Sequence, residues 1–163
     1  MDRKMEHTWK IYEHNNEWIK VSDTKASIVL ATNGVILAFF FKDISSIFPL
    51  IIKQEFLFIL FFILIYCIFL SIFYSIMCLV PRVGKSNPSI LFFEHINSFP
   101  RLEEYKKKFN TVLRSEIDLR FEVINQIWDI SIIASKKFNY VKKSILFLGL
   151  TILLLLFLLL GIL

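Results

Sequence analysis

The chain has 163 residues, of which 56% are apolar and 18 are phenylalanine, and its mean hydropathy is +0.61. A soluble globular domain of this length rarely contains so much apolar sequence, so the composition excludes that class and indicates a membrane protein. The 19 basic residues exceed the 14 acidic ones, which gives a formal net charge of +5.

The first apolar block covers residues 26–41 and follows a charged segment, residues 1–25, that contains neither proline nor glycine. We expect residues 1–25 to form a cytoplasmic helix that continues into the block. Sixteen residues of helix rise about 24 Å, slightly less than the ~30 Å hydrocarbon core of a bilayer. The block can span the bilayer if Lys25 and Lys42 extend their ammonium groups to the two interfaces. Five acidic residues in the preceding segment exclude a cleaved signal peptide.

The second apolar block is the strongest candidate for a transmembrane helix. Residues 56–80 contain no charged side chain, and the block stops at Pro81. The connection before it, residues 42–55, is short and contains Pro49. Residues 26–80 therefore predict a transmembrane helical hairpin.

Residues 81–143 form the longest polar connection, and we expect a helical cytoplasmic region. Prolines and a glycine between positions 81 and 100 indicate a loop or short helices, whereas residues 101–148 contain neither residue type. This second stretch predicts one long amphipathic helix, or two in series, that runs into a third span at residues 144–163. Its apolar seam is expected to pack on the N-terminal helix of the same chain or on the same seam of another copy. The seam consists of Leu102, Tyr105, Phe109, Leu113, Ile117, Phe121, Ile124, Trp128, Ser131, Phe138 and Val141.

The distribution of basic residues predicts the orientation of the spans. Residues 1–25 contain five lysines and arginines, residues 42–55 contain two, and residues 81–143 contain twelve. Because positively charged segments stay on the cytoplasmic side, the N-terminus is expected inside and the C-terminus on the periplasmic or extracellular side.

Signatures of catalysis are missing from the sequence. It contains no Walker loop, no GxGxxG motif and no GxSxG motif. His7, His14 and His95 are not accompanied by clustered cysteine or acidic ligands, so solvated or packed histidines are favoured over a metal site. We therefore expect neither an enzyme nor a metal or cofactor site.

Basic runs in the cytoplasmic region have two interpretations. Lys136-Lys137 and Lys142-Lys143 are typical of charges that orient a span or bind anionic head groups. The run Lys106-Lys107-Lys108 lies about 54 Å of helix from the third span, so lipid contact is less obvious there unless the chain folds back, and a soluble anionic ligand is the alternative. Arg114 and Arg120 suit phosphate in type, since a guanidinium group offers two parallel donors. They can equally pair with the nearby acids Glu116, Asp118 or Glu122.

Polar side chains accompany the first apolar block at its cytoplasmic edge and near its middle. Asp23 and Lys25 precede the block, and Asn33 follows Asp23 by about 15 Å of helix, beside Thr32. A carboxamide facing lipid would lack hydrogen-bond partners, so Asn33 is expected to face another helix or a hydrated path. One alternative is an interhelical hydrogen bond that fixes packing. The other is a pore lined by Asn33, with Asp23, Lys25 and Thr32 at its mouth and gate.

Several short motifs occur in order along nearly the whole chain. They are Trp18-Ile19, Asp23-Thr24-Lys25-Ala26, Asn33-Gly34, Pro81-Arg82, Leu91-Phe92-Phe93, His95-Ile96, Asp118-Leu119, Gln126-Ile127 and Ile133-Ala134-Ser135-Lys136-Lys137-Phe138. In these motifs the chain resembles the Pycsar effector family, membrane proteins of bacterial anti-phage defence.

The resemblance implies an effector that impairs the inner membrane of an infected bacterium. Its implied activator is a nucleotide, either a cyclic mononucleotide or an oligonucleotide, made by a neighbouring cyclase or nucleotidyltransferase. Direct contact with that enzyme is a further expected interaction. The resemblance also implies a role in nucleotide binding for Arg82 and His95, and a role in the pore or its gate for Asp23, Lys25 and Asn33.

Together these features predict an all-α integral membrane protein with three transmembrane helices and a helical cytoplasmic part, located in the bacterial inner membrane. Three spans are too few to enclose an aqueous path, so a pore requires a homo-oligomer, for which we expect four copies by analogy with small channels. The expected function is a nucleotide-controlled pore or ion channel. The alternative is a scaffold that conducts nothing and recruits a cytoplasmic partner through residues 101–141.

Overall fold

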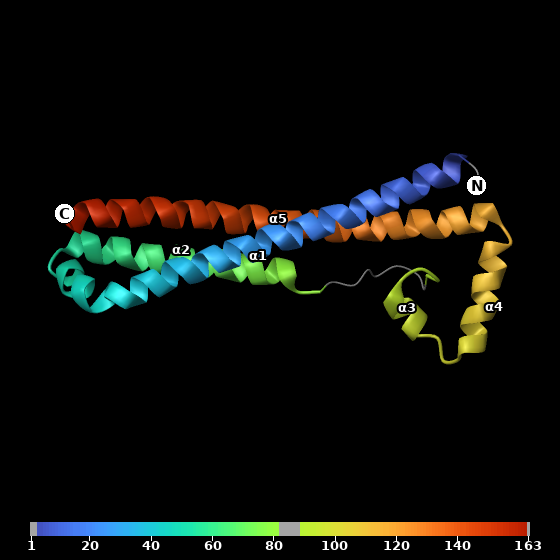
Figure 1. The fold of residues 1–163 in the computed structure, drawn as a ribbon, viewed down its shortest axis with the longest axis horizontal. Helices are drawn as coiled ribbons and strands as arrows, with labels where there is room; N and C mark the ends of the chain where they lie inside the picture. The colour runs from blue at the N-terminus through green and yellow to red at the C-terminus, as the bar shows by residue number, and fades with distance from the viewer. Residues whose placement is uncertain (1–2, 82–88, 163) are drawn as a thin grey trace. The chain divides into compact units, whose positions relative to one another are not determined.

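A computed structural model of the chain describes residues 3–81 and 89–162 (Figure 1). Its helices are α1 (Arg3–Ile52), α2 (Glu55–Leu79), α3 (Phe93–Asn97), α4 (Leu102–Leu113) and α5 (Glu116–Ile162), and the described residues contain no strand. Three segments are long and apolar enough to cross a membrane: Arg3–Lys42, Glu55–Leu79 and Glu116–Gly161. The predicted class, an all-α membrane protein with three spans, is therefore confirmed.

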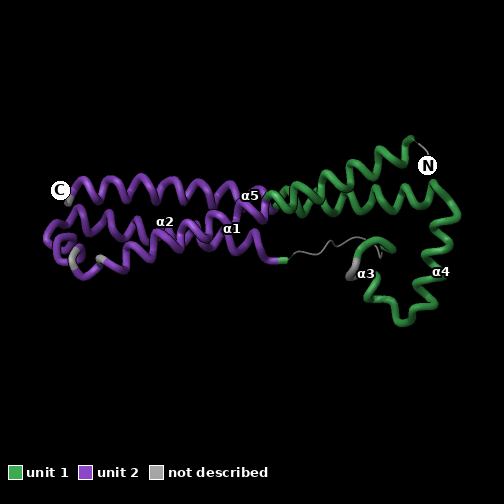
Figure 2. Tube along the Cα trace, in the orientation of Figure 1, with its two compact units in different colours: residues 1–21, 81–136 green, residues 22–80, 137–163 purple. Residues whose placement is uncertain are grey.

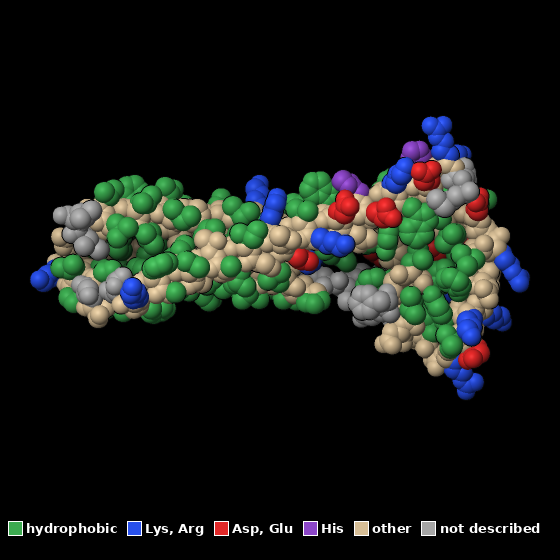
Figure 3. All heavy atoms as spheres, viewed as in Figure 1, with side chains coloured by type: hydrophobic (Ala, Val, Ile, Leu, Met, Phe, Trp, Pro, Cys, Tyr) green, Lys and Arg blue, Asp and Glu red, His purple; other side chains and the backbone are tan. Residues whose placement is uncertain are grey.

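Two compact units divide the chain (Figure 2). Unit 1 comprises residues 1–21 and 81–136, and unit 2 comprises residues 22–80 and 137–163. Helices α1 and α5 therefore each contribute to both units, whereas α2 belongs to unit 2 and α3 and α4 belong to unit 1. Charged side chains are frequent over unit 1 and sparse over the middle of unit 2 (Figure 3).

Unit 2 is a bundle of three helices whose buried apolar side chains form two clusters, a larger one and a smaller one around Ala26, Cys78 and Val141. Phe40 of α1, Leu64 of α2 and Leu158 of α5 are buried in the larger cluster, and the rings of Phe40 and Phe61 stack with their centroids 5.6 Å apart. Other large apolar side chains, such as Phe69, stay exposed on the outside of the bundle. Lipid provides no hydrogen bonds, so a segment as apolar as α2 satisfies its backbone by forming a helix.

The first transmembrane helix extends further than the sequence predicted. The expected span at residues 26–41 is part of a helix that ends only at Ile52, with Pro49 in its last turns. The expected connection therefore shrinks to residues 53–54. Tertiary packing explains the difference, because Ile51 is buried in the core of unit 2. This burial offsets the backbone hydrogen bond that a proline removes near the end of a helix.

Unit 1 contains the first part of α1, the helices α3 and α4, and the first part of α5. One face of α5 points into the unit, because Val123, Gln126, Ile130 and Ala134 are all buried. Their spacings of three and four residues put them on one side of a helix. Met5 of α1 is buried in the same unit.

The helical stretch expected after Pro100 is two helices in series. Helix α4 ends at Leu113 and α5 begins at Glu116, and the hydroxyl of Ser115 between them accepts a hydrogen bond from the backbone N–H of Asp118 over 3.2 Å. This contact caps the N-terminus of α5. A serine followed three residues later by an acid is a sequence signature of a helix start, so the break was readable in advance.

Most of the predicted apolar seam does not pack against other parts of the same chain. Val141 is buried and Tyr105 and Phe109 are half-buried, but most of the other apolar seam residues are exposed. The interpretation that the seam packs on the N-terminal helix of the same chain is therefore wrong for the first part of α5. A second face with helical spacing competes for that contact, and its smaller side chains, such as Val123 and Ala134, permit closer helix packing.

Candidate functional site

A series of hydrogen bonds joins the three helices of unit 2 in its core. Asn33 of α1 is fully buried, and its Nδ2 donates to Ser71 Oγ of α2 over 2.8 Å and to the Val29 carbonyl over 2.9 Å. The Ser71 hydroxyl in turn donates to the Ser144 carbonyl of α5 over 3.1 Å, and the hydroxyls of Ser75 and Ser144 are 2.6 Å apart. In apolar surroundings such contacts between helices fix their relative positions.

Asn33 therefore has the arrangement of the first alternative, an interhelical hydrogen bond within one chain. Its Oδ1 is buried and has no hydrogen-bond partner among the described residues, whereas the donor side of the carboxamide makes the contact with α2. A fully buried side chain is not presented to another subunit. Any influence of Asn33 on conduction would act through the packing of the three helices.

An ion pair connects α1 and α5 elsewhere in unit 2. Lys137 is only 5% exposed, and its Nζ donates to Asp23 Oδ1, while the Asp23 side chain remains 38% exposed. The Sγ of Cys78 lies 3.9 Å from the same carboxylate oxygen and 3.8 Å from the Ser22 carbonyl. An ammonium group that is withdrawn from water needs an anion beside it, so Asp23 stabilises the buried position of Lys137.

Lys25 and Thr32 lie on a different face of α1. Lys25 is exposed, and its Nζ lies 5.9 Å from the centroid of the Phe138 ring. Thr32 is partly exposed, and its hydroxyl donates to a backbone carbonyl one turn earlier in α1. Two residues seven positions apart lie two turns apart on nearly the same side of a helix. Of the four residues predicted for the pore and its gate, these two remain at the bundle surface.

Unit 1 contains a cleft of about 360 Å³ where the chain passes from α3 to α4. The rings of Phe99 and Tyr105 meet edge to face with their centroids 5.5 Å apart, and Lys108 Nζ lies 5.8 Å from the Phe99 centroid. The Tyr105 hydroxyl donates to the Ile90 carbonyl over 3.3 Å, which holds the ring in place. Aromatic faces stack on bases and cations bind phosphate, so this cleft combines two features of a nucleotide site. It is lined by Ile96, Asn97, Phe99, Arg101, Leu102 and Tyr105.

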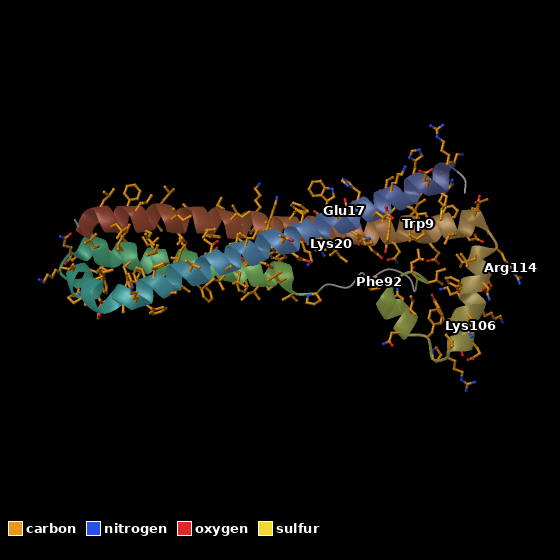
Figure 4. All side chains as sticks on the ribbon, in the orientation of Figure 1. Trp9, Glu17, Lys20, Phe92, Lys106 and Arg114 are labelled. Carbon is orange, nitrogen blue, oxygen red and sulfur yellow. The ribbon has the colours of Figure 1, made fainter. Side chains whose placement is uncertain are left out.

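The basic residues predicted for this region are distributed along α4 and the start of α5. Lys106 and Lys107 are exposed, whereas Lys108 is partly buried beside the cleft. Arg114 follows Lys106 by eight residues, or about 12 Å of helix, and lies at the C-terminal end of α4 (Figure 4). Arg120 lies on α5 and is partly buried. Of this set, Lys108 lies beside the Phe99 ring of the cleft.

His95 lies in α3 and supports the backbone that precedes this helix. Its Nδ1 accepts a hydrogen bond from the backbone N–H of Ser89 over 3.1 Å, and the Phe92 ring lies edge-on to the imidazole at 5.3 Å. The Ser89 hydroxyl accepts from the N–H of Leu91 over 3.1 Å. Arg82, the other residue to which the family resemblance gave a nucleotide-binding role, lies outside the described residues.

Several side chains of the polar contacts in unit 2 and of the cleft in unit 1 were not predicted from the sequence. Ser71 and Ser75 are one helical turn apart in a block without charges, and this spacing alone could have indicated a polar face on the second span. Lys137 was predicted only as part of a basic run and of a family motif, without its partner Asp23, and Arg101 had no predicted role. Within residues 3–81 and 89–162, no group of three or more His, Cys, Asp or Glu side chains could hold a metal ion.

Comparisons with known proteins agree over most of the chain. The profile of the family described as Pycsar effector protein domain matches residues 7–163. The Pycsar effector protein SaPycTM of Staphylococcus aureus is 32% identical over 130 residues, which cover 78% of this chain and 77% of that protein. No solved structure matches.

Proposed function

The chain belongs to the Pycsar effector family, membrane effectors of cyclic-nucleotide-signalled anti-phage defence, and from this premise we propose that it forms a nucleotide-controlled pore in the bacterial inner membrane. A nucleotide made by a partner cyclase or nucleotidyltransferase binds unit 1, and several copies together then let ions cross the bilayer. The protein acts by binding and conformational change and not by catalysis. The main support is that α1 and α5 each contribute to both units, so that the same helices carry the binding part and the membrane-spanning part.

The proposed nucleotide site is the cleft between α3 and α4 together with nearby cations. Phe99 and Tyr105 offer ring faces for a base, and Arg101 and Lys108 offer charge for a phosphate. The sequence adds further candidates for this site. They are Arg82, His95, Lys106, Lys107, Arg114 and Arg120, in addition to Lys108.

Replacing Arg101 and Lys108 together by glutamine is expected to weaken nucleotide binding strongly. Each lost charge-assisted contact to phosphate costs about 1.5–3 kcal/mol, which is about tenfold or more in affinity. Calorimetry on the purified full chain against cyclic CMP, cyclic UMP and short oligonucleotides measures this. The same ligand should trigger ion release from proteoliposomes.

The matched control is Lys53→Gln, which removes an exposed charge from unit 2 and should leave binding unchanged. Equal affinity of the double variant and the parent would exclude the cleft. Binding without ion release would leave the nucleotide site standing and would reject the pore.

The pore itself is proposed to lie between copies of the chain. The core of unit 2 is filled by side chains such as Leu64, Ile68 and Leu158, so an aqueous path through one bundle would require the core to open. Lys25 and Thr32, on the bundle surface, are candidates for lining a path between copies. Asp23 and Asn33, which bind other helices of the same chain, are candidates for controlling the tilt of α1. Four copies remain our expectation.

We expect a reporter that is active only in the periplasm to be active when it is fused to the C-terminus. A reporter that is active only in the cytoplasm is expected to be active at the N-terminus. The reason is the concentration of basic residues in residues 1–25 and 81–143. A reporter inserted at residue 105 should behave as cytoplasmic. A C-terminal fusion active only in the cytoplasm would contradict this orientation of the third span.

A further inference from the structure

The first part of α5 carries an apolar seam that faces away from the packed interior of unit 1. We define this outer seam as Ile117, Phe121, Ile124 and Trp128. The side chains are between 43% (Ile124) and 69% (Trp128) exposed. At 100° per residue the four positions fall within an arc of about 60°. An aromatic residue buries about 150–250 Å² when it is covered, so the two aromatic members alone make a large apolar surface.

Lipid is an unsuitable cover for this surface. Trp128, the seam residue nearest the third span, precedes Ser144, where the sequence predicts that the span begins, by 16 residues, or about 24 Å along α5. Five charged residues lie between the two positions: Asp129, Lys136, Lys137, Lys142 and Lys143. The seam therefore belongs to the aqueous side, where exposed apolar side chains of this size favour a protein partner.

We propose that the outer seam of α5 is a contact surface for a second copy of the same chain, and that it joins the cytoplasmic parts of neighbouring copies side by side in parallel. This inference rests on the proposed function in so far as that function requires several copies. It adds the surface through which the copies meet and the direction in which they run.

Membrane anchoring is the first argument for a second copy as the occupant. Helix α5 continues without a break from the seam to Ile162, within the third span. Every copy inserted in the same bilayer therefore presents the seam in the same direction along its own α5. Identical helices in parallel bring each seam residue opposite its own counterpart, which is the geometry of a parallel coiled coil.

The pattern of the seam is the second argument. The spacings of four, three and four residues continue the heptad alternation of a coiled-coil core, and all four core positions from Ile117 to Trp128 are apolar. Asp118 and Asn125 flank one side of the seam, while Arg120 and Ile127 flank the other. In neighbouring parallel copies, the edge with Asp118 would lie opposite the edge with Arg120, so like charges would not be brought together.

Photo-crosslinking in native membranes tests the proposal on the full chain. A photoreactive phenylalanine analogue at position 121 or 128 is expected to yield a covalent dimer, identified by pairing two differently tagged copies. The analogue at Glu13, an exposed position on α1, serves as the control and should give far less dimer. The side chains replaced are exposed, so the fold and membrane insertion should be retained.

Substitution provides the second measurement. Phe121→Asp combined with Trp128→Asp is expected to reduce oligomer recovered in mild detergent by at least about tenfold, because two charges would face each other in every contact. Ile11→Asp, at an exposed apolar position on α1 outside the seam, is the control and should leave oligomer recovery unchanged.

The outcomes separate the contact surface from the pore. A crosslink to a different protein, no crosslink at all, or full oligomer recovery in the double aspartate variant would overturn the proposed surface. A seam crosslink in a chain that releases no ions with nucleotide would leave the surface standing and would reject the pore. Ion release by a chain without the seam contact would reject the proposed surface and leave the pore standing.

Discussion

Replacing Asp23 by asparagine is expected to destabilise the helical bundle of unit 2 by about 2 kcal/mol. The ammonium group of Lys137, which is 5% exposed, would lose the carboxylate that balances its charge. Removing one partner of a fully buried ion pair costs about 3–5 kcal/mol. We expect less here because the Asp23 side chain is 38% exposed, so water screens the pair.

The measurement is loss of helical circular dichroism on heating in a mild detergent. Lys137→Met serves as the matched variant, since an apolar side chain of similar length suits the buried position and Asp23 can be hydrated. Lys137→Met should be less destabilising than Asp23→Asn, and the double variant should be close to Lys137→Met alone. Equal stability of Asp23→Asn and the parent would show that the pair does not hold α1 against α5.

Replacing Asn33 by leucine is expected to destabilise the same bundle by about 1–3 kcal/mol. The change removes the hydrogen bond to Ser71, and hydrogen bonds between transmembrane helices contribute about 0.6 kcal/mol on average and up to about 1.7 kcal/mol. It also places a bulkier side chain at a fully buried position, and overpacking typically costs about 1–3 kcal/mol. Loss of the unpaired carboxamide oxygen offsets part of this cost.

Thr32→Leu is the neighbouring control for Asn33→Leu. Thr32 is partly exposed and its hydroxyl donates to the Ile28 carbonyl of its own helix, so the substitution should leave the melting curve unchanged. The two variants therefore separate packing from conduction in a proteoliposome flux assay. A stable Thr32→Leu with reduced flux would support a path along that face of α1. An Asn33→Leu variant as stable as the parent but without flux would contradict the packing role and return Asn33 to the pore.

Apolar block length and charge determined the main features of this fold directly from the sequence. A charge-free run of 25 residues satisfies its backbone in lipid only as a helix, so α2 was predictable to within a residue at each end. The short motifs around Asp23, Asn33 and Pro81 were sufficient to indicate the family. The prediction that residues 42–55 form the connection was wrong for residues 42–52, which belong to α1. Proline disfavours helix only in its own turn, whereas the burial of Ile51 depends on tertiary contacts.

The partners of the polar residues were decided only by the tertiary structure. The sequence predicts that Asn33 needs a partner, but Ser71 lies 38 residues away and Lys137 lies 114 residues from Asp23, and spacing within one helix cannot identify contacts at such separations. Spacing within one helix likewise cannot identify the buried face of α5, because two of its faces carry residues at helical spacing. The tertiary structure shows that the face with Val123 and Ala134 is buried and that the larger side chains Phe121 and Trp128 remain exposed. How closely two helices approach depends on the side chains of both helices, so the pattern on α5 alone does not decide which face is buried.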